Sequence, residues 1–142
     1  MTLKVLLVED SVADSTLILE VLSEEKIAAD MFVVRDGVEA MDYLLKRGKH
    51  SDSVTPDLIV LDLNLPRKDG REVLAEIKTI PSICSIPIVI LTTSQAEEDI
   101  VKSYSLRASC YVSKPIDLDQ FVKIVRSIDD FWFTAVRYPL RH

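Results

Sequence analysis

The sequence predicts an α/β fold in which five parallel strands form one doubly wound sheet, (βα)5, followed by an extended C-terminal helix and tail. Three observations predict this fold. Short apolar runs alternate five times with amphipathic stretches, the apolar runs carry apolar residues on both faces, and 142 residues leave room for a single domain, 1–142. Such alternation requires right-handed crossovers and a parallel sheet that helices cover on both faces.

The first half of the chain is expected to contain three strands and two helices. Apolar residues recur every three or four positions in both helical segments, which is the period of a helix with one buried face. Gly37 ends the second strand, and the polar residues 47–56 indicate a loop. In order, the expected elements are a strand at 3–8, a helix at 11–26, a strand at 31–34, a helix at 38–46 and a strand at 58–61.

The second half continues the same alternation. Its first strand is the most apolar of the chain, and its last helix carries apolar residues over an arc of about 200°, where about 100° suffices to face a core. One flank of that helix is therefore left for another contact. The expected elements are a helix at 71–78, a strand at 86–91, a weaker helix at 96–106, a strand at 110–113 and a helix from 118 into 131–133.

Composition excludes several classes of function. The formal net charge of −6 disfavours binding to nucleic acid or to anionic lipid, both of which attract basic surfaces. The apolar run after Met1 is too short for a secretion signal, and no later run approaches the length that spans a membrane. Cys84 and Cys110 lie in apolar segments without a Cys-x-x-Cys pattern, so we expect reduced, buried thiols and a cytoplasmic location.

Polar residues follow four of the predicted strands. Glu9 and Asp10 end the first, Asp62 the third, Thr92 the fourth and Lys114 the fifth. In a doubly wound sheet these ends meet at one rim, where ligands bind. Each pair of carboxylates about 4 Å apart would repel by on the order of 4 kcal/mol at an effective dielectric constant near 20. A hard divalent cation such as Mg²⁺ relieves this repulsion and lets a carboxylate approach an anionic phosphoryl donor.

Each of these residues also has a simpler explanation. Glu9 and Asp10 suit the start of a helix, and Asp62 suits a polar loop. Thr92 suits a hydroxyl bonded to the backbone, and Lys114 a solvated charge. Singly these explanations are the commoner ones, but the joint occurrence at one rim favours a site.

The residues at the strand ends and the segments around them resemble those of a known family. Over residues 3 to about 128 the chain resembles the receiver domain of two-component response regulators, which implies a flavodoxin-like fold. The spacings from Asp62 to Thr92 and to Lys114 are those of that family. The matching segments are VLLVEDS at 5–11, DLIVLDLNLP at 57–66, PIVILT at 87–92 and YVSKP at 111–115.

The resemblance implies a metal site, and two positions, Thr93 and Ser94, depart from the commonest family pattern. Asp10 and Asp62 would bind Mg²⁺ directly, Glu9 through water, and Asn64 through its backbone carbonyl. Thr93 stands where the family often has Ala or Gly. Its β-branched side chain is expected to narrow access to Asp62 and to slow the exchange of small phosphodonors.

The resemblance also implies phosphorelay signalling rather than enzymatic turnover. Asp62 would accept a phosphoryl group from a histidine kinase, and Thr92 and Lys114 would bind its oxygens. Tyr111 would be the switch aromatic that turns inward with Thr92. The Lys114–Pro115 bond would be cis, as in the family.

The output is expected to be a phosphorylation-switched surface that an unidentified downstream protein recognises. The aromatic residues Phe131, Trp132 and Phe133 favour a homodimer through the last helix, the last strand and the extension 129–142. The alternative is a tail that folds back on its own domain. The long loop and aromatic extension further resemble the small response regulators that serve cyanobacterial phytochromes, which implies a light-regulated kinase.

Three other functions stay open at this stage. A flavodoxin-like electron carrier needs a phosphate-binding loop after the first strand, and the acidic residues 9–14 disfavour it. A haloacid-dehalogenase type phosphatase needs a second Asp two positions after the nucleophile, where this chain has Asn64. A receiver that acts only as a scaffold would not need the complete set of site residues.

Overall fold

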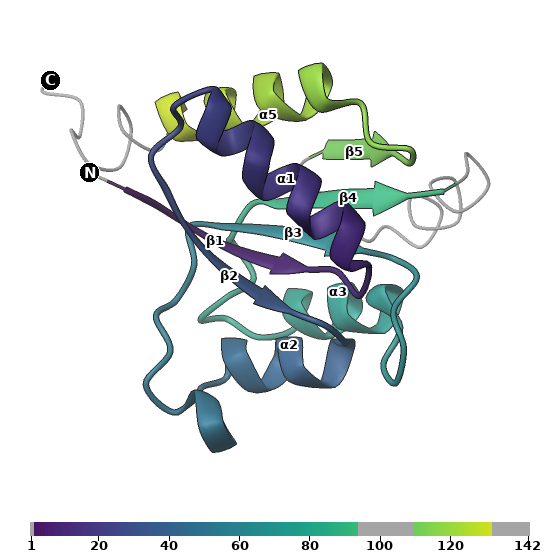
Figure 1. Cartoon of the computed structure of the whole chain (residues 1–142). Helices are drawn as coiled ribbons and strands as arrows, with labels where there is room; N and C mark the ends of the chain where they lie inside the picture. Colours follow the sequence, from purple (N-terminus) through teal and green to yellow (C-terminus); the bar gives the residue numbers. More distant parts are fainter. Residues whose placement is uncertain (1, 94–109, 132–142) are drawn as a thin grey trace, which may run out of the picture.

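The sheet lies at the centre of the structure. In the computed structural model, which describes residues 2–93 and 110–131, five parallel strands follow the order β2-β1-β3-β4-β5 (Figure 1). The strands are β1 Leu3–Val8, β2 Ala29–Val34, β3 Leu58–Asp62, β4 Ile88–Thr92 and β5 Cys110–Ser113. The helices are α1 Val12–Glu24, α2 Gly37–Leu44, α3 Gly70–Lys78 and α5 Leu118–Phe131. This topology is that of the flavodoxin-like fold, so the predicted fold class is confirmed.

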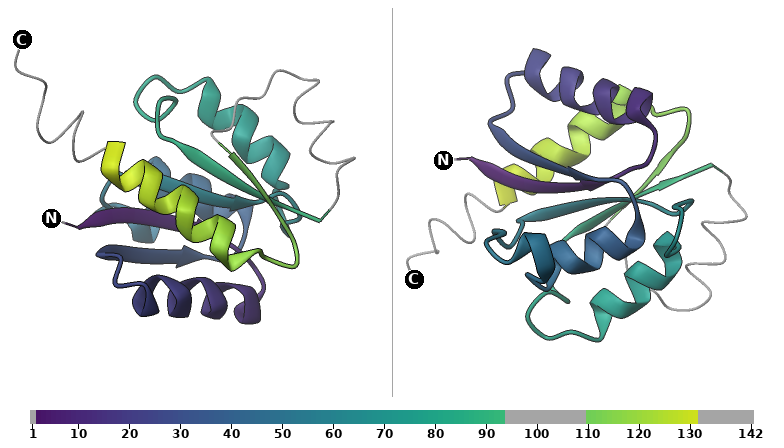
Figure 2. Two further views of the ribbon diagram at one scale, coloured as in Figure 1. Left: turned by 90° about the horizontal axis from the view of Figure 1, so that it is seen from above. Right: turned by 60° about the horizontal axis from the view of Figure 1, so that its bottom comes forward.

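Helices cover both faces of the sheet. Figure 1 and Figure 2 show α1 and α5 on one face and α2 and α3 on the other. Successive strand residues point to opposite faces, so Leu6 and Val8 join the core beneath α2 and α3, while Val5 and Leu7 join the core beneath α1 and α5. Apolar residues on both faces of each central strand therefore explain why the sheet is buried on both sides.

The prediction misplaced the start of β2 and oversimplified one loop. Strand β2 begins at Ala29, two residues before its predicted start. As an edge strand it admits the exposed Asp30, whose carboxylate lies 3.2 Å from the ammonium group of Lys4. The predicted loop 47–56 contains a short 3₁₀ turn, Gly48–His50, whose histidine is buried. Polar composition alone did not indicate this turn.

The two cysteines are free thiols, but they are half-buried rather than buried. Cys84 lies in the turns between α3 and β4, and its thiol contacts the carbonyl oxygen of Pro81 at 3.6 Å. Cys110 is the first residue of β5, which pairs with β4. Cys84 lies in a turn and Cys110 begins a strand that is only partly buried, so apolar neighbours in the sequence overstated the burial of both thiols.

Two further expectations concern the second half of the chain, and a third concerns all of the described residues. The Lys114–Pro115 peptide bond is cis, as the resemblance implied. The predicted helix at 96–106, together with Trp132 and Phe133, lies outside the described residues. Within the part of the chain that is described, no helix has both the length and the apolar character needed to cross a membrane.

Gly70 fixes the start of α3 against the end of β3. A Cβ atom at this position would overlap the carbonyl oxygen of Asp62 and lie 2.6 Å from Leu63 Cα. Because both neighbours are backbone atoms, no side-chain rotation relieves the overlap. We expect Gly70→Ala to lower the free energy of unfolding by about 3 kcal/mol, measured by urea denaturation.

The control for this prediction is Gly48→Ala. Gly48 has a positive φ of 57°, but a Cβ there meets nothing within 4 Å. The only cost is that of placing alanine in a left-handed backbone conformation, so we expect the free energy of unfolding to fall by about 1 kcal/mol. An equal loss in both variants would contradict the role assigned to Gly70.

Candidate functional site

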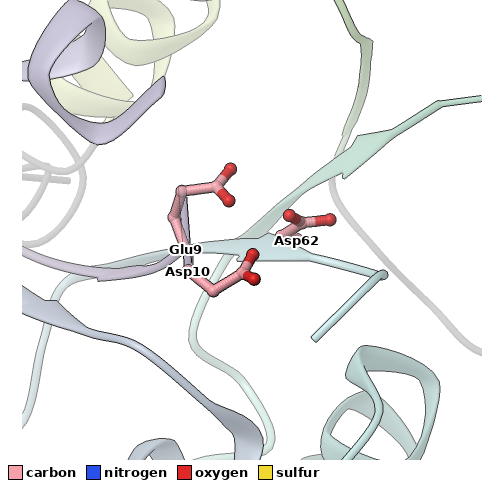
Figure 3. Close-up of side chains that lie close together, drawn as sticks. All are labelled: Glu9, Asp10 and Asp62. Atoms are coloured by element: carbon pink, nitrogen blue, oxygen red, sulfur yellow. The ribbon is translucent and has the colours of Figure 1, made fainter. Parts of the chain in front are cut away.

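Three carboxylates meet beyond the ends of β1 and β3. Glu9 and Asp10 follow β1, and Asp62 is the last residue of β3, which pairs with β1. One carboxylate oxygen from each residue lies within 4.8 Å of the other two (Figure 3). Glu9 and Asp62 are buried, whereas Asp10 is exposed. An all-oxygen donor set of this kind, with one side open to solvent, fits a hard divalent cation.

Lys114 reaches into the same cluster from the segment after β5. Its Nζ lies 2.8 Å from Asp62 Oδ2, 2.6 Å from Glu9 Oε1 and 3.1 Å from Asp14 Oδ2. Its backbone N–H donates to the carbonyl oxygen of Thr92 at 2.7 Å, which fixes its place beside β4. Burial opposes the charge on Lys114, but hydrogen bonds to Asp62 and Glu9 outweigh burial and raise its pKa. The ammonium group is therefore the positive charge that the structure places among these carboxylates.

Glu9 is the most buried of the three carboxylates. Burial raises its pKa from 4.5 to about 7, and the neighbouring Asp62 adds to the effect, while Lys114 and the N–H of Ser11 oppose it. Glu9 Oε1 lies 2.6 Å from Lys114 Nζ, and the same ammonium group also contacts the buried carboxylate of Asp62. One ammonium group does not balance two buried carboxylates and the nearby Asp10, so the residues present fit a divalent metal.

The remaining predicted site residues surround Asp62. The N–H of Asn64 donates to Asp62 Oδ1 at 2.9 Å, and its Nδ2 donates to Thr93 Oγ1 at 3.3 Å. Thr92 is buried at the end of β4, next to β3. Tyr111 in β5 is half-buried and packs against the core beneath α2 and α3. The predicted roles of all these residues, the carbonyl ligand from Asn64 and the switch role of Tyr111 included, stay predictions.

Two residues at the site were missed by the sequence reasoning. Asp14 contacts Lys114, and Arg35 donates from Nη1 to the carbonyl oxygen of Glu9 at 3.1 Å and to Ser15 Oγ at 3.0 Å. Asp14 lies in the first turn of α1, and no spacing in the sequence indicated that it would contact the segment after β5. Nothing in the sequence pointed to Arg35, because its role depends on how β2 lies beside β1.

The raised pKa of Glu9 predicts a pH-dependent stability of the metal-free protein. In the unfolded chain Glu9 loses its proton near pH 4.5, whereas the folded protein keeps it to about pH 7. The folded state therefore binds more protons in this window, and the free energy of unfolding falls as pH rises through it, by on the order of 3 kcal/mol. Urea denaturation at pH 5 and pH 8 with a chelator present measures this loss.

The matched variant is Glu9→Gln, which keeps the side-chain volume and removes the titration. We expect its stability to fall less than that of the native chain between these pH values. An identical pH dependence in both proteins would show that another group is responsible.

Comparison with known proteins identifies the family. Residues 5–126 match the response regulator receiver domain. The chain is 49% identical to the response regulator Rcp1 of Synechocystis sp. over 135 residues, which cover 95% of this chain and 92% of that protein. The crystal structure of the phosphorylated cyanobacterial phytochrome response regulator RcpA is similar, with a TM-score of 0.79 at 48% identity over 96% of this chain and 97% of that one.

A second solved structure is the Mn²⁺-bound form of Rcp1. It is 50% identical, with a TM-score of 0.76, and the alignment covers 91% of this chain and 93% of that one. The match to the receiver domain spans most of the sequence and includes both strands that end in the acidic cluster. The chain therefore belongs to the family of response regulator receiver domains.

Proposed function

We propose that this receiver accepts a phosphoryl group on Asp62 from a histidine kinase and signals through the surface that phosphorylation changes. The observation that carries the proposal is the position of Asp62, a buried carboxylate 2.8 Å from an ammonium group and within the acidic cluster. Phosphorylation adds about 1.5 to 2 negative charges at such a site, which can bias a neighbouring segment between two arrangements.

The proposed metal is Mg²⁺. Asp10 and Asp62 would bind it directly, Glu9 through water and Asn64 through its carbonyl oxygen. The Mn²⁺-bound form of Rcp1 supports a divalent cation in a similar protein. The cation supplies positive charge that offsets the carboxylates and the incoming phosphoryl oxygens.

The proposed chemistry is a single displacement at phosphorus. An oxygen of Asp62 forms a bond to phosphorus, and the bond from phosphorus to the imidazole nitrogen of the donor breaks, with the electron pair remaining on that nitrogen. Lys114 and Thr92 bind the phosphoryl oxygens. Such a transfer stores the group as an acyl phosphate and needs no turnover, so we propose a signalling protein rather than an enzyme.

The proposed phosphodonor is a phytochrome histidine kinase. Support comes from the similarity to RcpA, a cyanobacterial phytochrome response regulator, at 48% identity over 96% of this chain. We place the reaction in the cytoplasm, which is consistent with two free thiols, Cys84 and Cys110. The proposal also includes a downstream protein partner that recognises the phosphorylated surface.

We propose residues 1–142 as a single domain. We also propose a homodimer that forms through α5, β5 and the extension 129–142. The aromatic residues Phe131, Trp132 and Phe133 support it by composition, since aromatic residues are enriched in interface centres. Sedimentation over a concentration series tests it, and a monomer at tens of micromolar would contradict it.

Intact-mass measurement tests the main proposal. After incubation with acetyl phosphate and Mg²⁺, we expect one phosphoryl group per chain, removable with hydroxylamine as an acyl phosphate should be, and no adduct when a chelator replaces Mg²⁺. An adduct that survives hydroxylamine would contradict the proposal. Repeated turnover of phosphate esters would instead favour the phosphatase alternative.

A further inference from the structure

Asp14 has no role in the proposed phosphoryl transfer, yet it contacts Lys114. It lies in the first turn of α1, and its own N–H donates to the capping hydroxyl of Ser11 at 3.1 Å. A carboxylate at this helix position often bonds back to the N–H of the capping residue. Here that N–H donates to Glu9 Oε2 at 3.1 Å. The side chain of Asp14 instead lies 3.1 Å from Lys114 Nζ.

The ammonium group of Lys114 has three N–H bonds, and three carboxylates lie around it. Glu9 and Asp62 also belong to the acidic cluster that fits a cation, whereas Asp14 does not. A phosphoryl oxygen on Asp62 needs one of those N–H bonds. Asp14 is therefore the partner that competes with the phosphoryl group for Lys114 once the metal offsets the other two carboxylates.

The charge of Asp14 also opposes an incoming phosphodonor. Its Oδ2 and the Oδ2 of Asp62 each lie about 3 Å from the same nitrogen, so they are at most about 6 Å apart. At this distance a carboxylate repels a dianionic phosphoryl group through partly buried surroundings. A small phosphodonor has few other contacts to offset this repulsion, whereas a kinase domain contributes a whole interface.

We propose that Asp14 is a specificity-determining residue: it restrains Lys114 and slows phosphoryl uptake from small anionic donors. The inference rests on the proposed function of Asp62. The reaction concerned is attack of an Asp62 oxygen on the phosphorus of acetyl phosphate. The bond from phosphorus to the acetyl oxygen breaks, and acetate leaves with the electron pair.

The test compares the native chain with Asp14→Asn, which keeps the shape of the side chain and removes its charge. At saturating Mg²⁺, we expect Asp14→Asn to take up the phosphoryl group from acetyl phosphate about tenfold faster by intact mass. By calorimetric titration without any phosphodonor, we expect Mg²⁺ to bind the same variant a few-fold more weakly, because one nearby negative charge is lost. Faster phosphoryl uptake together with weaker Mg²⁺ binding indicates a charge effect, because structural damage would slow uptake as well as weaken Mg²⁺ binding.

Two further variants complete the design. Glu20→Gln removes the same charge from an exposed position further along α1, and we expect native uptake and native Mg²⁺ affinity. Asp14→Glu restores the charge, and we expect its uptake to be slow, as in the native chain. It also controls for the substitution itself, because an Asp14→Glu variant as fast as the Asn variant overturns the proposal.

Each outcome decides the matter. Unchanged or slower uptake by Asp14→Asn at saturating Mg²⁺ overturns the inference, as does a joint loss of uptake and of thermal stability. If the native chain itself takes up no phosphoryl group, the proposed function fails first. If the native chain is phosphorylated and Asp14→Asn is no faster, only the inference about Asp14 fails.

Discussion

Asp62→Asn is expected to abolish phosphoryl uptake, to below detection by intact mass under conditions that label every native chain. An amide does not supply the anionic oxygen that attacks phosphorus. The fold should survive, because the Oδ1 atom of the asparagine can still accept from the N–H of Asn64, as Asp62 does at 2.9 Å. The same experiment with the partner kinase as donor should give the same result.

The control for this variant is Asp52→Asn, in the loop that joins α2 to β3. Asp52 is exposed and lies at the opposite end of the sheet from the acidic cluster, so the substitution should leave uptake unchanged. Labelling of Asp62→Asn at the native rate would mean that another residue accepts the group. Loss of labelling in both variants would point to a general defect and would contradict the assignment.

The fold was predictable because the central strands are apolar along their length, which indicates that both of their faces are buried. Strand β3 is buried at every position, and the sequence offers Leu58 to Leu61 without a polar residue. Strand β2 was harder, because an edge strand has one neighbour and admits exposed side chains such as Asp30 and Phe32. Its first residues therefore do not look like a strand.

The acidic cluster was predictable for a topological reason. Parallel strands place their carboxyl ends at one edge, so residues after β1 and β3 must be close wherever these strands pair. The contact between Asp14 and Lys114 follows no such rule. It depends on how the first turn of α1 packs near the segment after β5, and sequence spacing does not determine this packing.

The position of Lys114 leads to the second large prediction. Lys114→Met is expected to lower the free energy of unfolding of the metal-free protein by about 3–5 kcal/mol at neutral pH, since removing one partner of a buried ion pair leaves unpaired charge. Methionine keeps the length of the side chain, so the loss reports charge more than packing. The carboxylates of Glu9, Asp14 and Asp62 would then face one another without their ammonium partner.

Two conditions should reduce the effect of Lys114→Met if repulsion among these carboxylates is its cause. Millimolar Mg²⁺ should recover more stability in the variant than in the native chain, because a bound cation supplies the missing charge. Lowering the pH to 5 should also reduce the loss, because protonation of Glu9, whose pKa is already raised to about 7, removes one negative charge. Urea denaturation with and without Mg²⁺ at both pH values measures these effects, with Lys123→Met on the exposed side of α5 as the control. A loss that neither Mg²⁺ nor acid reduces would show that Lys114 stabilises the fold by packing, and the electrostatic account of the site would have to be abandoned.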